Sequence, residues 1–95
     1  FMKVIWSPEA VQDRLAIWEY LVAENPQAAI DMDERFGVAA GRLATHPMIG
    51  HSGKIQGTRE LNPHESYRLV YEIQGEQVWI LALVHTARLW PPVKE

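Results

Sequence analysis

Two strand patterns near the carboxyl end, residues 67–73 and 78–84, constrain the fold most. The first alternates apolar and polar side chains with the period of a half-buried strand, so Arg68 lies on the polar side. The second is apolar on both faces, as expected of a central strand. Residues 74–77, which include Gly75, predict the turn of a hairpin between them. A sheet must therefore form the centre of the fold.

Two helices are predicted ahead of this hairpin, and each begins with a capping residue followed by proline. Ser7 and Pro8 begin a helix that ends at Asn25 and Pro26, and this second pair begins another helix that runs to residue 45. Because almost no loop separates the helices, they should form an antiparallel hairpin.

Each helix carries an apolar face that we expect to pack on the sheet. In the first helix the face follows i, i+4, i+7, i+11 spacing and is widened by two neighbours: Val11, Leu15, Trp18 and Val22, with Ile17 and Leu21. In the second helix it comprises Ala29, Met32, Phe36, Ala39, Ala40 and Leu43. Gly37 and Gly41 interrupt the second helix, where each costs up to about 1 kcal/mol relative to alanine, so they predict close packing against a neighbour, with a weakened helix as the alternative.

A short first strand and a loop rich in helix and strand breakers complete the predicted elements. Lys3–Trp6 is β-branched and aromatic, which suits a strand. Residues 46–57 contain one proline and three glycines and predict a loop, followed by a strand at residues 58–61 and a turn at residues 62–65.

The expected element order is β-α-α-β-β-β. This order predicts an α+β fold, an antiparallel-rich sheet with the helical hairpin packed on one face. Residues 1–95 fit one domain, and we set Phe1 aside because Met2 has the character of a native start.

Composition excludes several classes of function. The chain has no cysteine, which rules out disulfides, thiolate nucleophiles and cysteine-based zinc sites. His46, His51 and His64 lack the spacing of metal ligands, so we expect neither a metal nor another cofactor. A net charge of −3 without a Lys/Arg cluster disfavours general nucleic-acid binding. No apolar run approaches the ~20 residues of a membrane span and no signal-peptide pattern is present, so a cytoplasmic protein without a membrane partner is expected.

The candidate functional residues lie at the ends of the predicted strands. His85 has an unperturbed pKa near ~6.5 that suits a general acid or base, and Glu60 and Glu65 are alternative bases. Structural roles compete with these functions. Arg68 can pair with Glu60 or Glu72 across the sheet, and His85 can fasten the segment that follows it. Trp90 can fold back over a sheet edge or the rim of the core, and stacking on a base is the alternative.

Five sequence motifs in order resemble the RelE/ParE superfamily of type II toxins. They are Asn25-Pro26-x-Ala28-Ala29, His46-Pro47-x-x-Gly50, Arg59-Glu60-Leu61, Tyr67-Arg68-Leu69-Val70-Tyr71 and His85-Thr86-Ala87-Arg88-x-Trp90-Pro91. The resemblance covers essentially the whole chain. It implies a growth-inhibiting bacterial toxin of the plasmid-stabilisation type, neutralised by a cognate antitoxin, with a toxin dimer as a further possibility.

The resemblance also implies two alternative targets. RelE-like members cleave mRNA on the ribosome without a metal, and for such an endoribonuclease the matching catalytic residues are Arg68, His85 and Arg88. ParE-like members poison DNA gyrase through a protein–protein contact. For either target, Arg59 and Trp90 are the expected contact residues. A protein-binding module without toxicity is the third alternative.

Three features favour the gyrase target over the ribosome. Residues 58–61 read Thr-Arg-Glu-Leu where RelE members place two lysines, and the chain ends five residues after Trp90 without the tyrosine-bearing terminal segment of those nucleases. The isoelectric point near 5.8 is also a poor match to ribosomal RNA. We therefore expect a gyrase poison, with the ribosome-dependent mRNA endonuclease as the alternative.

Overall fold

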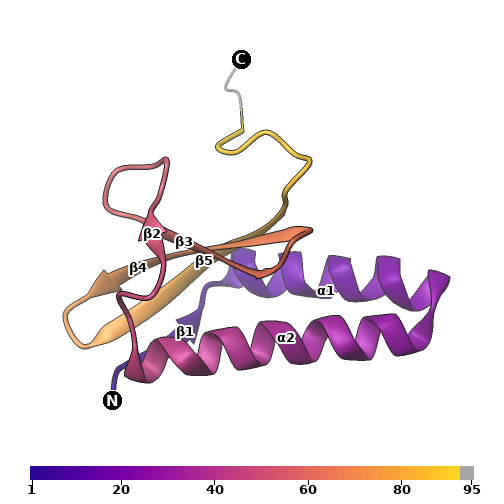
Figure 1. The fold of residues 1–95 in the computed structure, drawn as a ribbon, viewed down its shortest axis with the longest axis horizontal. Helices are drawn as coiled ribbons and strands as arrows, with labels where there is room; N and C mark the ends of the chain where they lie inside the picture. Colours follow the sequence, from indigo (N-terminus) through magenta and orange to yellow (C-terminus); the bar gives the residue numbers. More distant parts are fainter. Residues whose placement is uncertain (93–95) are drawn as a thin grey trace.

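In the computed structural model, which describes residues 1–92, two helices cover one face of a five-stranded sheet (Figure 1). The elements are β1 (Lys3–Trp6), α1 (Pro8–Glu24), α2 (Pro26–Thr45), β2 (His51–Ser52), β3 (Arg59–His64), β4 (Tyr67–Gln74) and β5 (Gln77–His85). The strand order is β1-β5-β4-β3-β2, with β1 parallel to β5 and all other neighbours antiparallel. The predicted α+β fold is confirmed. Residues 93–95 of the predicted domain lie outside the described residues.

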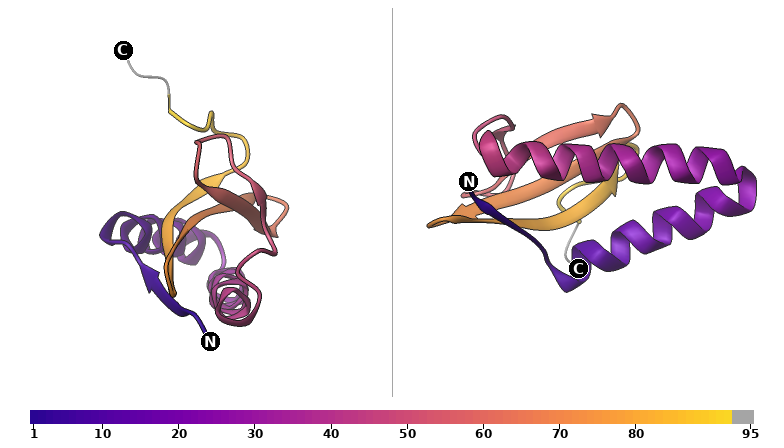
Figure 2. Two further views of the ribbon diagram at one scale, coloured as in Figure 1. Left: turned by 90° about the vertical axis from the view of Figure 1, so that its left-hand side faces the viewer. Right: turned by 90° about the horizontal axis from the view of Figure 1, so that it is seen from below.

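Both helix starts follow the predicted capping chemistry. The Ser7 Oγ accepts the Ala10 N–H at 3.1 Å, and the Asn25 Oδ1 accepts the Gln27 N–H at 3.0 Å. Ser7 Oγ also donates to the Leu81 carbonyl at 3.3 Å, which joins the start of α1 to β5. Because Asn25 alone separates the helices, α1 and α2 run antiparallel as a hairpin (Figure 2, right).

The main core lies between the hairpin and the sheet. The predicted face of α2 is buried, with Ala29, Phe36, Ala39, Ala40 and Leu43. From β4, Tyr67, Leu69 and Tyr71 point toward the helices and are buried, which confirms the predicted alternation of that strand. The rings of Phe36 and Tyr67 meet edge to face with centroids 5.4 Å apart. Burial of each such side chain contributes about 1.5–3 kcal/mol.

The predicted face of α1 is only partly correct. Three of its four defining residues are exposed, with exposed fractions of 49% for Val11, 48% for Leu15 and 37% for Val22. Ile17, which was predicted to widen that face, does pack against the core, and beside it lies Ala10, which was not predicted and is fully buried.

Arg14 lies beside the buried side of α1 and contacts two other elements. Its Nε donates to the Asp33 carboxylate of α2 at 2.6 Å, and its guanidinium lies 4.7 Å from the centre of the Trp6 ring of β1. Since α1 has apolar residues around most of its circumference, spacing alone does not select a face. The packing of Ala10 and Ile17 against the core defines the buried side, and the contacts of Arg14 are consistent with it.

The close packing predicted from the α2 glycines is absent. A Cβ on Gly37 would meet only Arg14 Nη2, at an ordinary 3.6 Å, and a Cβ on Gly41 would have no described atom within 4 Å. Both glycines are exposed to solvent, and this flank of α2 therefore packs closely on no other element at either position.

The edge of the sheet extends beyond the prediction. β3 continues to His64, so the turn predicted at residues 62–65 shortens to residues 65–66, and the unpredicted β2 pairs with Arg59 and Glu60. Pro63 suggested a turn, but β2 pairs with only the first part of β3, so the missing Pro63 N–H is tolerated on this outer edge. The β3–β4 register is irregular between Leu61 and His64.

Candidate functional site

The segment after β5 borders a pocket on the side of the sheet that faces α1. Its volume is about 640 Å³, and its walls come from α1, the ends of β4 and β5, and residues 87–92. Three of the predicted site residues line it: His85, Arg88 and Trp90. Asp13 and Tyr20 of α1 face them across the pocket.

The pocket lies beside an open edge of the sheet. β1 pairs only with residues 77–80 of β5, so no described strand covers residues 81–85 on that side. Asp13 Oδ2 accepts the Leu83 N–H at 3.0 Å, and Ser7 bonds the Leu81 carbonyl. The side chains of Asp13 and Ser7 therefore form hydrogen bonds with backbone groups of β5 that would otherwise pair with a further strand.

Burial perturbs the ionisation of two pocket residues, and it raises the pKa of the Tyr67 hydroxyl as well as that of Asp13. Burial raises the pKa of the Asp13 carboxyl above its ordinary value, while the Leu83 N–H and the charge of Arg88 lower it by less. The charge of Glu9 raises it slightly further. Burial in the pocket thus disfavours the negative charge of the Asp13 carboxylate, and the positive charge of Arg88 partly offsets this effect.

His85 fastens the exit segment, as predicted from its position at the end of the strand. Its Nδ1 accepts the Ala87 N–H at 3.0 Å, and its ring packs edge to face on Tyr67 with centroids 5.3 Å apart. The Thr86 N–H donates to the Ser66 carbonyl at 2.9 Å, which closes the same turn. A nitrogen that accepts a hydrogen bond carries no proton, so only Nε2 of His85 is free to donate.

Arg68 does not line this pocket. In the β4–β5 register Tyr67 pairs with His85, and both side chains point to the helix side. Arg68 follows Tyr67 in the strand and points to the opposite side. The predicted catalytic residues Arg68 and His85 therefore lie on opposite faces of the sheet.

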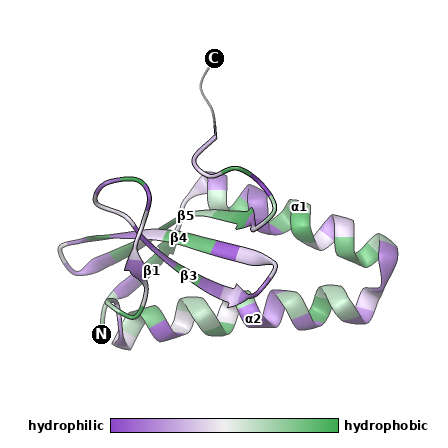
Figure 3. Cartoon of the chain, turned by 45° about the horizontal axis from the view of Figure 1, so that its top comes forward, coloured by the Kyte–Doolittle hydropathy of each residue, from purple (hydrophilic) through white to green (hydrophobic). Residues whose placement is uncertain are grey.

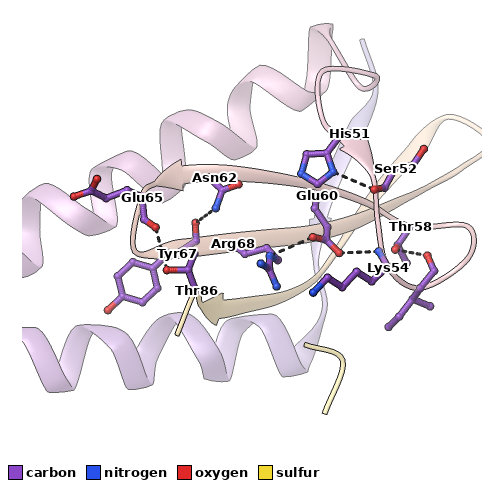
Figure 4. Close-up of polar contacts among 11 residues, drawn as sticks. His51, Ser52, Lys54, Thr58, Glu60, Asn62, Glu65, Tyr67, Arg68 and Thr86 are labelled. Atoms are coloured by element: carbon purple, nitrogen blue, oxygen red, sulfur yellow. Dashed lines mark hydrogen bonds and ion pairs between the residues drawn. The ribbon is translucent and has the colours of Figure 1, made fainter. Parts of the chain in front are cut away.

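Arg68 pairs there with Glu60, one of the two acidic partners that the sequence offered. The Arg68 Nε lies 3.2 Å from Glu60 Oε1, and the Glu60 side chain is only 2% exposed (Figure 4). Glu60 Oε2 also accepts the Lys54 N–H at 3.0 Å, which fastens the loop between β2 and β3. The guanidinium of Arg68 is thus part of a buried structural network.

Trp90 folds back over the outer face of the sheet, where residues 81–85 of β5 form an open edge. It packs against Val70, Ala82 and Val84 as a second, small apolar cluster. Its indole Nε1 is buried and has no hydrogen-bond acceptor among residues 1–92. The predicted folding back of Trp90 is confirmed.

Arg59, the other predicted contact residue, fastens a loop. Its Nη2 donates to the Met48 carbonyl at 3.1 Å and to the Gly50 carbonyl at 2.5 Å. Tyr71 supports the same loop, since its hydroxyl donates to the Pro47 carbonyl at 2.6 Å and accepts the Gly50 N–H at 2.9 Å.

Sequence reasoning missed Asp13 and Tyr20 as pocket residues. The available signal was the spacing of Asp13, three residues after Ala10 and four before Ile17, which places the carboxylate on the buried side of α1. That side was not recognised because the apolar stripe on another side of the helix was chosen.

Within residues 1–92, no three His, Asp or Glu side chains lie close enough together to hold a metal ion. No helix in that part of the chain is long and apolar enough to cross a membrane.

Two types of sequence comparison match nearly the whole chain. Residues 4–90 match the family model described as the ParE toxin of the type II toxin–antitoxin system parDE. The putative toxin Y4kP of Sinorhizobium fredii is 33% identical over 92 residues, which covers 96% of this chain and 95% of the relative. Toxin RelE2 of Caulobacter vibrioides is 33% identical over 87 residues, with coverages of 92% and 98%.

Solved structures share the fold. A chain of the chromosomal ParDE toxin–antitoxin system from P. aeruginosa superposes with a TM-score of 0.78 at 19% identity, covering 88% of this chain and 95% of that one. The YoeB dimer from Staphylococcus aureus gives a TM-score of 0.58 at 15% identity, with coverages of 85% and 92%. At these identities the likeness concerns the fold alone.

Proposed function

This chain belongs to the ParE toxin family of type II toxin–antitoxin systems, and on that basis we propose that it arrests growth by binding DNA gyrase rather than by cleaving RNA. It is a toxin whose partner in the system is an antitoxin. The proposal concerns the target.

The separation of Arg68 from His85 supports the proposal most directly. Cleavage through a 2′-hydroxyl needs a general base, a general acid and a charge stabiliser around one phosphate. Arg68 and His85 lie on opposite faces of the sheet, and Arg68 is neutralised by the buried Glu60. One phosphate therefore does not contact both groups, whereas a protein–protein contact does not require them together.

The distribution of charge agrees with a protein target. Docking on RNA gains affinity from several cations that neutralise phosphates. In the pocket, Arg88 already faces the carboxylate of Asp13, and the chain as a whole carries a net charge of −3. These charges give RNA little attraction.

A ribosome-dependent mRNA endonuclease is the second candidate. The observation that favours it is the pocket itself, since His85, Arg88 and Asp13 line it together. In that case His85 Nε2 would be the donor and Arg88 the charge stabiliser, and the reaction would need no metal.

Tightly controlled expression in a bacterial host separates the candidates. A gyrase poison should stop DNA synthesis first and induce the SOS response, and the purified protein should inhibit supercoiling by purified gyrase. Immediate loss of translation with cleaved mRNA would contradict the proposal and support the nuclease. Expression to the same level without any growth defect would contradict both targets and support a non-toxic binding module.

A further inference from the structure

A groove lies between the exposed side of α2 and the second half of β3. Its volume is about 470 Å³, and residues 61–63 form its β3 wall. β2 pairs only with residues 59 and 60, so no described strand covers this wall. On the α2 wall, Val38 is 58% exposed although it lies in the middle of the helix. An uncovered end of a strand and an uncovered apolar side chain thus face the same groove.

Charged side chains lie around Val38 on the same wall. Asp31, Glu34 and Arg35 precede it, Arg42 follows it, and all four are exposed. Residues three, four or seven positions apart share one side of a helix, and hydrophilic residues recur along α2 in Figure 3. Glu34, Arg35 and Arg42 form no ion pair within residues 1–92. This side of α2 therefore carries charges of both signs that are available to a partner.

The two ends of this side carry opposite net charge. Ahead of Val38, two acidic residues and one basic residue of the groove give −1, and beyond it Arg42 gives +1. An antiparallel pair of helices opposes the first end of one helix to the second end of the other, so two copies would attract each other. A parallel pair would bring like ends together. Because the four charges sum to zero, a partner of a single charge sign gains less from them than a second copy does.

The spacing of the charges is symmetric about Val38. Glu34 and Arg42 each lie four residues from Val38, which is about 6 Å along the helix axis. With a two-fold axis beside Val38, Glu34 of one copy therefore lies opposite Arg42 of the other, and the same pair occurs again at the other end. Asp31, one turn before Glu34, lies within a turn of the same arginine. The two Val38 side chains meet between the ion pairs.

We propose that two copies of this chain form a dimer through antiparallel α2 helices, with Val38 at the two-fold axis and a Glu34–Arg42 ion pair on each side of it. The rim of the groove between α2 and β3 in each copy lies against the other copy. This groove shares no lining residue with the pocket beside α1 and β5. The dimer therefore forms whether the toxin acts on gyrase or on RNA.

Charge reversals that cancel each other test the proposal. Glu34→Arg brings two arginines face to face at each end of the interface, and Arg42→Glu brings two acidic groups face to face. The double variant Glu34→Arg with Arg42→Glu restores both pairs with their signs exchanged. Glu19→Arg is the matched control, because it reverses an exposed acidic residue of α1 outside the groove. The purified chains are compared by sedimentation and light scattering over a range of concentrations, after circular dichroism has shown that each is folded.

The unaltered chain, the double variant and Glu19→Arg should dimerise with similar affinity. Each single reversal should raise the dissociation constant of the dimer by about tenfold or more, because two attractive contacts become repulsive. An equimolar mixture of the two single variants should dimerise again, since each supplies the charge that the other lacks. A general loss of stability would not produce this recovery.

Several results would overturn the proposal. A monomeric unaltered chain, or a dimer that neither single reversal weakens, would exclude this interface. A mixture of the single variants that remains monomeric would show that the two charges do not face each other. An equal loss in Glu19→Arg would assign the effect to net charge. Weaker binding of the antitoxin to both single reversals, together with a monomeric unaltered chain, would assign the groove to the antitoxin. Absence of gyrase inhibition would refute the proposed target and leave these outcomes unaffected.

Discussion

Replacing Arg68 alone, and then together with Glu60, separates a structural role of Arg68 from a catalytic one. In Arg68→Met the Glu60 carboxylate, 2% exposed, loses its cation and keeps the Lys54 N–H. Breaking a buried pair typically costs 3–5 kcal/mol, and because the Arg68 side chain is 18% exposed we expect about 3 kcal/mol. For a domain of this size this cost lowers the Tm by more than about 10 °C.

The double replacement removes the buried charge as well. Glu60→Leu with Arg68→Met puts apolar side chains of similar size on a face that already carries Val70, Val84 and Trp90. Such replacements are often neutral, so the double variant should lie within about 1.5 kcal/mol of the unaltered protein. Toxicity should fall in the single variant through unfolding and return in the double variant.

Thermal unfolding followed by circular dichroism and growth arrest at matched expression levels are the two assays. A double variant that regains the original Tm and yet is not toxic would refute the structural role, because it would show that the guanidinium acts on the target. An unchanged Tm of Arg68→Met would refute the expected loss of about 3 kcal/mol, since it would mean that the ion pair with Arg68 does not stabilise the buried Glu60 carboxylate.

Three further changes test individual contacts. Gly41→Ala should stabilise the toxin by about 1 kcal/mol, because a helix interior favours alanine and no atom obstructs the new Cβ; a lower Tm would contradict this. Because burial raises the pKa of Asp13 above 3.8 in the folded protein, the stability from this group is greatest below that pH and is lost as the pH rises through the folded pKa. Asp13→Asn, whose amide oxygen still accepts the Leu83 N–H, should therefore flatten this part of the pH–stability curve and raise the Tm at pH 7 by a few degrees; an unchanged curve would contradict it. Tyr71→Phe removes the hydroxyl bonded to two loop backbone groups and should cost about 1–3 kcal/mol in urea unfolding, and no change in midpoint would show that the loop is held otherwise.

Local chemistry was enough to predict most of the elements. The Ser7 and Asn25 caps, each followed by proline, placed both helices at their observed bounds. The alternation of residues 67–73 identified the helix-facing side of β4. These features depend on groups a few residues apart, so they can be recognised without the fold.

Contacts between distant residues decided the candidate site. The edge-to-face contact of His85 with Tyr67 and the pairing of Arg68 with Glu60 depend on the register of three strands. Without that register the sequence did not distinguish the roles of Arg68 and Arg88. The pocket role of Asp13 depends on a hydrogen bond to Leu83, 70 positions away. No local pattern encodes such a bond.

The sequence by itself determined where the chain forms helices and strands, because capping and periodicity act over a few residues. It also determined the toxin family through its ordered motifs. Only the tertiary structure decided which side of α1 is buried, because Ala10 and Ile17 pack against core residues from elements distant in the sequence. That choice leaves Val11, Leu15 and Val22 exposed, since a helix with apolar residues on several sides can bury only the side that its neighbours contact.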